Sequence, residues 1–306
     1  MSAPGAGARE GSMGSAGSTG SLAGASGSTG PMGSTGASGS LAGASAQACA
    51  CAQREEPASF VPDTCAIVVA GGSGERFGDP RGKQFVPLCG LPLLCWPLMA
   101  IDRAPSVRSI IVVCPGGRIE ETRDRVVRRV QLRCEVTLVE AGATRQESVA
   151  NGLAAMPRDV PIVAIHDGAR PLIETEAVER AIGTVRENED VAGAICAQRC
   201  TDTLKLVEDG AISATPDRTQ YWSAQTPQVF ARRTIMAAHG AARWEGYQGT
   251  DDASLVERRG GRVVVVESSR GNIKVTMPED LAIAEAIMEQ RLVEAGHACA
   301  KEGADS

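Results

Sequence analysis

The chain has 306 residues, a formal net charge of −6 at pH 7 and only 3% aromatic residues. This balance weighs against a nucleic-acid surface, which needs clustered basic and stacking side chains. No run of the sequence approaches the roughly eighteen apolar residues of a membrane span, so we expect neither a nucleic acid nor a membrane as a partner.

The first part of the chain differs from the rest. Residues 1–48 are almost entirely Gly, Ser, Ala and Thr. Such a segment can bury too little apolar surface to offset the entropy lost when it is ordered. These residues also lack the basic start and continuous apolar stretch of a signal peptide, so we expect a cytoplasmic protein. We predict a disordered low-complexity tail over 1–60, a folded domain over 61–295 and a flexible C-terminal tail over 296–306.

Short apolar runs rich in β-branched residues then alternate with segments of helical period. The predicted strands are 65–70, 109–114, 135–140, 161–166, 191–196 and 262–267, and the predicted helices are 92–104, 117–130, 145–156, 174–188 and 278–294. Strands without polar alternation are typical of a parallel sheet covered by helices on both faces. We therefore expect an α/β fold with a doubly wound, mostly parallel sheet.

Residues 197–228 interrupt this alternation. Two short strand-like pieces flank Asp209 and Gly210, a pair favoured in hairpin turns. A hairpin this polar has little core of its own, so we predict an arm that packs on a second subunit and makes the protein a homodimer. The ten cysteines form no CxxC pair and lie mostly in apolar runs, so we expect reduced, mainly buried thiols.

Ligands of open α/β sheets bind beyond the carboxyl ends of the strands. The first such segment is AGGSGERFGDPRGKQ over 70–84. Gly71 and Gly72 would let backbone N–H groups approach phosphate oxygens, and Arg76 and Lys83 would add fixed positive charge. The segment thus predicts a phosphate-binding loop, and an ordinary tight turn is the alternative.

This loop matches neither of the two common glycine-rich motifs. The GxxxxGK[ST] spacing fails because Phe77 stands where a glycine is needed and Gln84 follows Lys83. The GxGxxG fingerprint fails because Gly72 and Gly74 are followed by the same Phe77. Neither a P-loop nor a dinucleotide-binding turn is therefore predicted.

The second loop is AGATRQESVANGL over 141–153. Gly142 allows a close approach, and Arg145 can donate hydrogen bonds to a base or a phosphate. Ser148 lies near the start of a predicted helix, where a serine either binds a ligand or caps the helix.

The third loop, HDGARP over 166–171, places Asp167 at the end of a buried strand beside Gly168. A carboxylate in this position suits a magnesium ion or ribose hydroxyls. Arg170 either joins the site or pairs with Asp167. We interpret His166 as a core histidine.

Further along the chain, Arg218 lies in the arm and Lys274 lies in GNIKVTMPEDL, before the last helix. Isolated arginines usually face solvent. The chain holds only four lysines, however, and two of them, Lys83 and Lys274, stand beside predicted ligand loops.

Taken in order over 65–290, these motifs resemble the 2-C-methyl-D-erythritol 4-phosphate cytidylyltransferases of the non-mevalonate isoprenoid pathway. The motifs are AGGSGERFG…KQ, TRQESV, HDGARP, TDTLK, the DR before YWSAQTPQVF, TDDASLVE and NIKVTMPEDL. The resemblance implies a Rossmann-like nucleotidyltransferase fold and a reaction between CTP and a polyol phosphate that releases pyrophosphate.

The resemblance also implies the role of each residue. Arg76 and Lys83 match the catalytic pair that stabilises the transition state. The residues that position the acceptor are Arg218, Lys274, Thr203, Thr226 and Thr250. Those that bind the nucleotide are Ala70, Gly71, Gly72, Gly142, Arg145, Ser148, Asp167 and Gly168, and Asp167 is also the expected ligand of Mg²⁺.

Two departures and several alternatives remain. Ala143 stands where some relatives carry a polar residue, and Gly168 stands where alanine is common. The chain has only three histidines, so we expect no fused zinc-dependent cyclase. The nearest alternative is a ribitol 5-phosphate cytidylyltransferase. More distant ones are a nucleotide-sugar pyrophosphorylase and a CTP-binding regulatory module without activity.

Overall fold

We analysed a computed structural model that describes residues 61–72, 77–78 and 82–296. The chain divides into one unit over 1–55 and another over 56–306, and every described residue belongs to the second. The predicted N-terminal tail and all but one residue of the predicted C-terminal tail lie outside the described residues.

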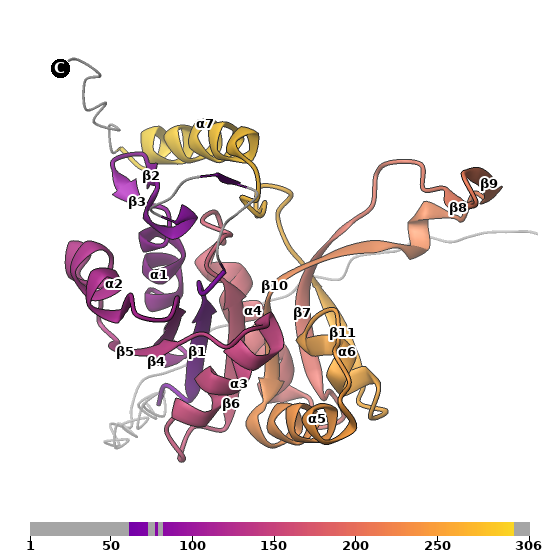
Figure 1. Cartoon of the computed structure of the whole chain (residues 1–306), viewed down its shortest axis with the longest axis horizontal. Coiled ribbons are helices and arrows are strands. Elements are labelled where there is room, and N and C mark those ends of the chain that lie inside the picture. Colours follow the sequence, from indigo (N-terminus) through magenta and orange to yellow (C-terminus); the bar gives the residue numbers. More distant parts are fainter. Residues whose placement is uncertain (1–60, 73–76, 79–81, 297–306) are drawn as a thin grey trace, which may run out of the picture. The chain divides into compact units, whose positions relative to one another are not determined.

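A seven-stranded sheet forms the centre of this unit (Figure 1), in the order β11-β7-β10-β6-β1-β4-β5. The strands are β1 Thr64–Val69, β4 Val107–Cys114, β5 Glu135–Glu140, β6 Ile162–Asp167, β7 Gly193–Arg199, β10 Trp222–Ala231 and β11 Val263–Glu267. All neighbours pair in parallel except β10, which runs antiparallel to both β6 and β7. The mostly parallel sheet expected from the sequence is confirmed.

Helices cover both faces of the sheet. They are α1 Cys95–Asp102, α2 Ile119–Arg125, α3 Arg145–Ala155, α4 Thr175–Glu187, α5 Arg232–Glu245, α6 Asp252–Glu257 and α7 Pro278–Glu294. Side chains of a strand point alternately to its two faces. In β1, Ala66 and Val68 therefore enter a core shared with α1 and α4, while Cys65 and Ile67 enter a core shared with α3, α5 and α6. The fold is doubly wound.

Helix α7 packs outside these two cores. Its Ala284 and Met288 join a third cluster with Leu88 and Leu93, from the region of the short strands β2 Pro87–Leu88 and β3 Leu91–Pro92. This contact holds α7 near the carboxyl ends of the parallel strands.

Strand β10 was not predicted from the sequence. Its polar run SAQTPQ resembles a loop, yet the structure buries Gln228 at 1% exposure in the middle of the sheet. Both ends of the Gln228 amide are bonded: its Oε1 accepts from the backbone N–H groups of Asp252 and Ala253, and its Nε2 donates to Asp251. A buried amide satisfied from another segment cannot be recognised by hydrophobic periodicity.

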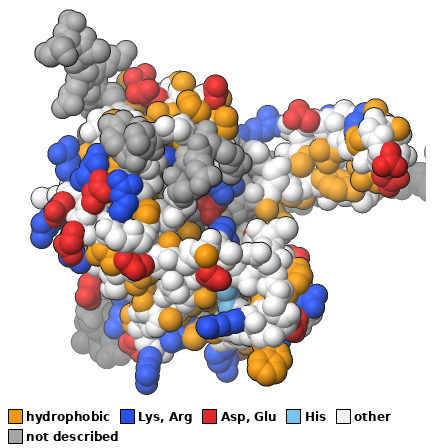
Figure 2. Space-filling model, viewed as in Figure 1, with side chains coloured by type: hydrophobic (Ala, Val, Ile, Leu, Met, Phe, Trp, Pro, Cys, Tyr) orange, Lys and Arg blue, Asp and Glu red, His pale blue; other side chains and the backbone are white. Residues whose placement is uncertain are grey.

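The predicted hairpin within 197–228 is present as β8 Leu206–Glu208 and β9 Ala211–Ala214, a separate two-stranded sheet. Asp209 and Gly210 have φ of 49° and 79°, as a two-residue hairpin turn with two positive φ values requires. Leu206 and Ile212 are more than half exposed. Figure 2 shows hydrophobic side chains on this hairpin, at the right of the view.

Two further expectations concern cysteines and membranes. The cysteines of the described residues are free, and Cys65, Cys95, Cys114, Cys134 and Cys196 are buried, as expected. Within the same residues, no helix combines the length and the hydropathy that crossing a bilayer requires.

Two aromatic residues provide a test of this architecture. Phe230 of β10 is 0% exposed and Trp244 of α5 is 92% exposed. We expect Phe230→Ala to lower the free energy of unfolding by about 3–5 kcal/mol, and Trp244→Ala to change it by less than about 0.5 kcal/mol. Urea denaturation of both variants measures this, and equal effects would contradict the central place of β10.

Candidate active site

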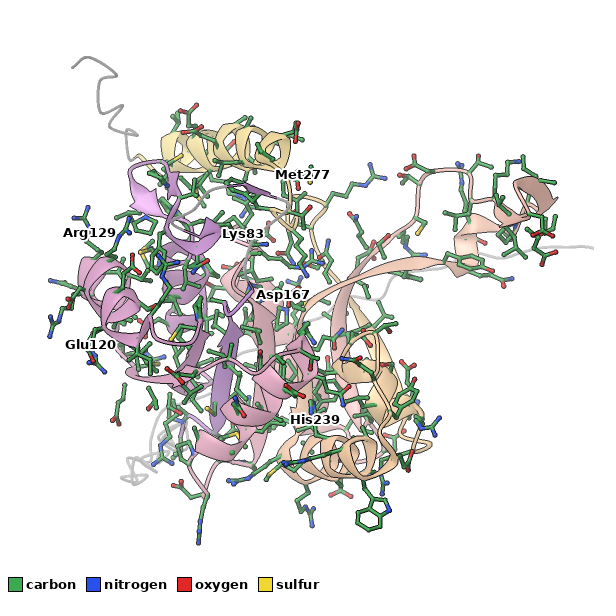
Figure 3. The ribbon with its side chains drawn as sticks, in the orientation of Figure 1. Lys83, Glu120, Arg129, Asp167, His239 and Met277 are labelled. Carbon is green, nitrogen blue, oxygen red and sulfur yellow. The ribbon has the colours of Figure 1, made fainter. Side chains whose placement is uncertain are left out.

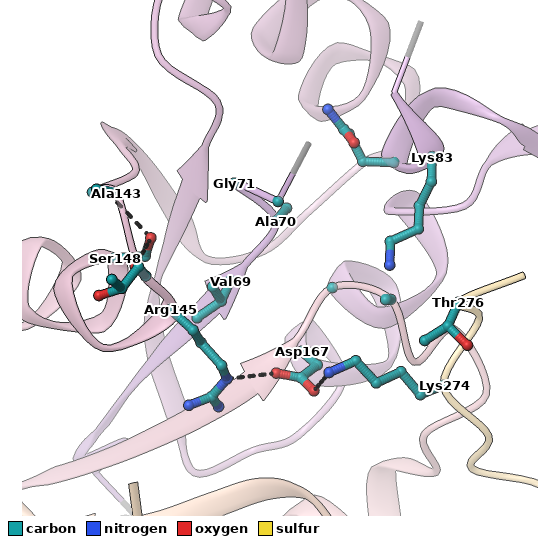
Figure 4. A pocket seen from close by; sticks show the side chains of 16 residues that line it. Val69, Ala70, Gly71, Lys83, Ala143, Arg145, Ser148, Asp167, Lys274 and Thr276 are labelled. Carbon is teal, nitrogen blue, oxygen red and sulfur yellow. Dashed lines mark hydrogen bonds and ion pairs between the residues drawn. The ribbon is translucent and has the colours of Figure 1, made fainter. Parts of the chain in front are cut away.

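A cavity of about 580 Å³ lies at the carboxyl ends of β1 and β6 (Figure 4). The residues with predicted site roles that line it are Ala70, Gly71, Gly72, Lys83, Gly142, Arg145, Ser148, Asp167, Gly168 and Lys274. Val69, Gln84, Ala143, Thr144, Ala169 and Thr276 complete the lining. Three loops predicted to bind a ligand thus converge on one space.

The first two loops touch at Gly71. A Cβ added to Gly71 would lie 2.1 Å from Cβ of Ala141, the residue that directly follows β5. Ala141 is fixed because its N–H donates to the carbonyl of Cys114 at the end of β4. Only glycine leaves room for the Gly71 backbone to approach the side chain of Ala141 this closely.

The loop before α3 is held by its own hydrogen bonds. The hydroxyl of Thr144 accepts from the N–H of Glu147 and caps the helix. Ser148 donates to the Thr144 carbonyl at 2.8 Å, and its Oγ accepts from the N–H of Gly142 at 3.2 Å. The start of α3, the positive end of its dipole, therefore lies beside the cavity, which favours an anionic ligand there.

Asp167 is the centre of the charges in the cavity. Its Oδ1 lies 3.2 Å from Nε of Arg145, its Oδ2 lies 2.8 Å from Nζ of Lys274, and Nε of Arg170 is 3.9 Å from Oδ2. Burial by itself would raise the pKa of Asp167, but Arg145 and Lys274 outweigh it and hold that pKa well below its usual range. The carboxylate is therefore ionised at neutral pH.

Arg145 has a second acidic partner. Its Nη1 lies 2.7 Å from Oδ2 of Asp252, which is 1% exposed and also contacts Nε2 of His239 at 3.0 Å. Burial would lower the pKa of Arg145, while Asp252 and Asp167 raise it above its usual value. The guanidinium is thus fixed between carboxylates from β6 and α6.

Lys83 approaches the same space from the opposite side. Its Nζ donates to the carbonyl of Val275 at 3.1 Å, next to Lys274 in the chain. The N–H of Val275 in turn donates to the carbonyl of Ala169. Figure 3 shows Lys83 and Asp167 at the same end of the sheet.

The structure does not bring every predicted residue into the cavity. Arg76 lies outside the described residues. Arg218 and Thr203 are exposed in the arm, where Nη1 of Arg218 donates to the carbonyl of Thr201, and Thr250 is exposed just before α6. Thr226 is 4% exposed and does not line the cavity.

Among the residues of this site for which no role was predicted, three carry polar side chains of interest. Gln84 and Thr276 line the cavity, and Asp252 holds Arg145. Asp252 lies in the motif TDDASLVE, but an acidic residue at a helix start usually serves the helix itself. Only the fold reveals that this carboxylate faces Arg145.

The comparisons with known proteins agree with this geometry. The model of the 2-C-methyl-D-erythritol 4-phosphate cytidylyltransferase family matches residues 64–290. A relative of that name from Geobacter metallireducens is 43% identical over 230 residues, which are 74% of this chain and 98% of the relative. One from Prochlorococcus marinus is 43% identical over 232 residues, with the same two shares.

Solved structures are similar as well. The 4-diphosphocytidyl-2C-methyl-D-erythritol synthase from Anaerococcus prevotii has a TM-score of 0.66 and 28% identity, over 74% of this chain and 95% of its own. A 2-C-methyl-D-erythritol 4-phosphate cytidylyltransferase from Thermus thermophilus has a TM-score of 0.59 and 30% identity, over 72% of this chain and 97% of its own.

A pair of glycine variants tests the contact between the first two loops. We expect Gly71→Ala to lower the free energy of unfolding by about 1–3 kcal/mol and to weaken CTP binding, because the new Cβ displaces Ala141. At Gly72 no described residue lies within 4 Å of an added Cβ, so Gly72→Ala should change stability by less than about 0.5 kcal/mol. Urea denaturation and CTP calorimetry measure both, and equal stabilities would refute the close packing.

Proposed function

The chain belongs to the 2-C-methyl-D-erythritol 4-phosphate cytidylyltransferase family, and from that premise we propose that the cavity around Asp167 is where its reaction occurs. The enzyme transfers CMP from CTP to 2-C-methyl-D-erythritol 4-phosphate in non-mevalonate isoprenoid biosynthesis, and pyrophosphate leaves. One observation carries the proposal: Asp167 and three cations from separate segments, Lys83, Arg145 and Lys274, meet beside two glycine loops.

The relatives and structures named above favour this acceptor over the ribitol 5-phosphate alternative. Their names refer to methylerythritol phosphate or to its cytidylyl product.

The nucleotide binds along the two glycine loops. Gly71 and Gly72 offer backbone N–H groups to the triphosphate, while Ala70, whose N–H is donated to the carbonyl of Val113, lines the cavity beside them. Lys83 and, by family resemblance, Arg76 offer positive charge to the triphosphate. Arg145 contacts the rest of CTP, Ser148 and Gly142 hold the shape of the second loop through their mutual hydrogen bond, and Gly168 lines the cavity. Ala143 has no polar side chain, and its N–H is donated to Glu147, so neither group is available to the nucleotide.

The chemical step joins two anions. An oxygen of the acceptor phosphate attacks the α-phosphorus in line, and the bond from that phosphorus to the oxygen bridging to the β-phosphate breaks, so pyrophosphate leaves with the electron pair. No general base is needed because a phosphate dianion is already nucleophilic. Repulsion between the reactants is the main obstacle, which Lys83 and Arg76 reduce at the triphosphate and Lys274 reduces at the acceptor.

The residues at Asp167 fit a magnesium ion. Among the described residues no group of three or more His, Cys, Asp or Glu side chains could hold a metal. Magnesium, however, often takes only one or two carboxylates and completes its shell with phosphates and waters. Asp167 would supply one oxygen, and the bound ion would neutralise charge on the triphosphate.

The arm completes the acceptor site from a second subunit. Arg218 and Thr203 lie in the arm rather than in the cavity, and the exposed Leu206 and Ile212 offer apolar surface for a homodimer contact. In this arrangement Arg218 of one subunit and Lys274 of the other hold the same acceptor phosphate. We place the enzyme in the cytoplasm, where cysteines stay reduced, because those of the described residues are free thiols.

The role of Lys274 predicts a selective kinetic effect. Lys274→Ala should raise the KM for the acceptor by about tenfold or more and change the KM for CTP much less, because the lost charge faces the attacking phosphate. Lys274→Arg keeps the charge and should recover part of the affinity. Pyrophosphate release at varied concentrations of each substrate measures this, and equal effects on both KM values would contradict the assignment.

Mixed dimers test the shared site. At acceptor concentrations well below the KM, Arg218→Ala and Lys274→Ala homodimers should each lose most of their activity. A heterodimer of the two holds one intact site, so a randomly exchanged mixture should recover about a quarter of wild-type activity. If both residues served the site of their own subunit, mixing would restore no activity.

A further inference from the structure

The backbone of Asp167 is held by a second set of contacts, which do not involve its carboxylate. Its N–H donates to Oγ1 of Thr226 at 3.0 Å. The same Oγ1 lies 3.1 Å from Nδ1 of His166, whose Nε2 lies 3.2 Å from the carbonyl oxygen of Arg170. His166 is 0% and Thr226 4% exposed, so water does not replace any of these partners.

The chemistry of these groups determines which atom donates in each hydrogen bond. A carbonyl oxygen only accepts, so Nε2 of His166 carries the hydrogen. Oγ1 of Thr226 already accepts from the N–H of Asp167, so Nδ1 of His166 is the acceptor that the described residues offer to the hydrogen of this buried hydroxyl, and Nδ1 carries no hydrogen. The hydroxyl of Thr226 therefore donates to Nδ1 while its oxygen accepts from Asp167. Each donor then has one acceptor.

These hydrogen bonds are connected to the segment that carries Lys274. Nη1 of Arg170 donates to the carbonyl of Asn272 at 2.7 Å. Nδ2 of Asn272 donates to the carbonyl of Thr226 at 3.0 Å. Asp167, its support and the lysine that pairs with it thus belong to one hydrogen-bonded unit.

We propose that Thr226 and His166 are positioning residues: their directional hydrogen bonds hold Asp167 where one carboxylate oxygen meets Arg145 and the other meets Lys274. The inference rests on the proposed role of the cavity around Asp167. It replaces direct contact with the acceptor as the role of Thr226, because the hydroxyl is already used twice beneath Asp167.

The two roles of Thr226 predict different kinetics. A direct contact would affect only the acceptor. A displaced Asp167 disturbs Arg145 on the nucleotide side and Lys274 on the acceptor side, so Thr226→Val should raise both KM values and lower kcat, each by about fivefold or more. Thr226→Ser restores the hydroxyl and should return all three to within about twofold of wild type.

The tautomer of His166 gives a readout that requires no activity. In ¹⁵N-labelled wild-type protein at pH 7, His166 should show a protonated Nε2 and an unprotonated Nδ1, and His166→Gln identifies its signals. A hydrogen on Nδ1 would overturn the proposal. So would a Thr226→Val enzyme with wild-type constants, or one with only the acceptor KM raised.

These outcomes are separable from those for the cavity itself. If Lys274→Ala leaves the acceptor KM unchanged, the site assignment fails even where the His166 signals follow the expected pattern. If Lys274→Ala behaves as expected but the Thr226→Ser enzyme has kinetic constants as impaired as those of Thr226→Val, the positioning role alone is wrong.

Discussion

The arrangement depends on one buried carboxylate placed between two cations. Asp167 contacts Arg145 from α3 and Lys274 from the segment before α7, residues that are far apart in the sequence. An ionised carboxylate in a buried position is costly unless it is paired. Its pairing therefore requires α3, β6 and the segment before α7 to meet at the same end of the sheet, which is also where a nucleotide loop can reach them.

Much of this fold could be predicted because its strands are buried on both faces. Short uninterrupted runs rich in β-branched residues, such as those at 109–114 and 161–166, are typical of strands buried on both faces, and each ligand loop follows directly from such a run. The two strands that pair with the central β1 were found in this way. The glycines of the loops were identifiable from their composition alone.

The remaining parts depended on contacts between distant segments. Strand β10 carries Gln228, whose amide bonds to the start of α6, and no local pattern encodes a partner that lies in another element. For the same reason Asp252 could not be assigned to Arg145, and Thr226 could not be separated from the residues that face the cavity. In each of these cases a polar side chain is buried by its partner rather than by its hydrophobicity.

The pairing of Lys274 with Asp167 means that the resting enzyme already contains a counterion for the lysine. If Lys274 holds the acceptor phosphate as proposed, that phosphate competes with the carboxylate, and its net gain in free energy is the difference between two ionic contacts. Singly charged anions of the surrounding solution gain little from such an exchange, whereas a dianion gains more. Under the role proposed for Lys274, its pairing with Asp167 therefore favours a doubly charged phosphate over small singly charged anions.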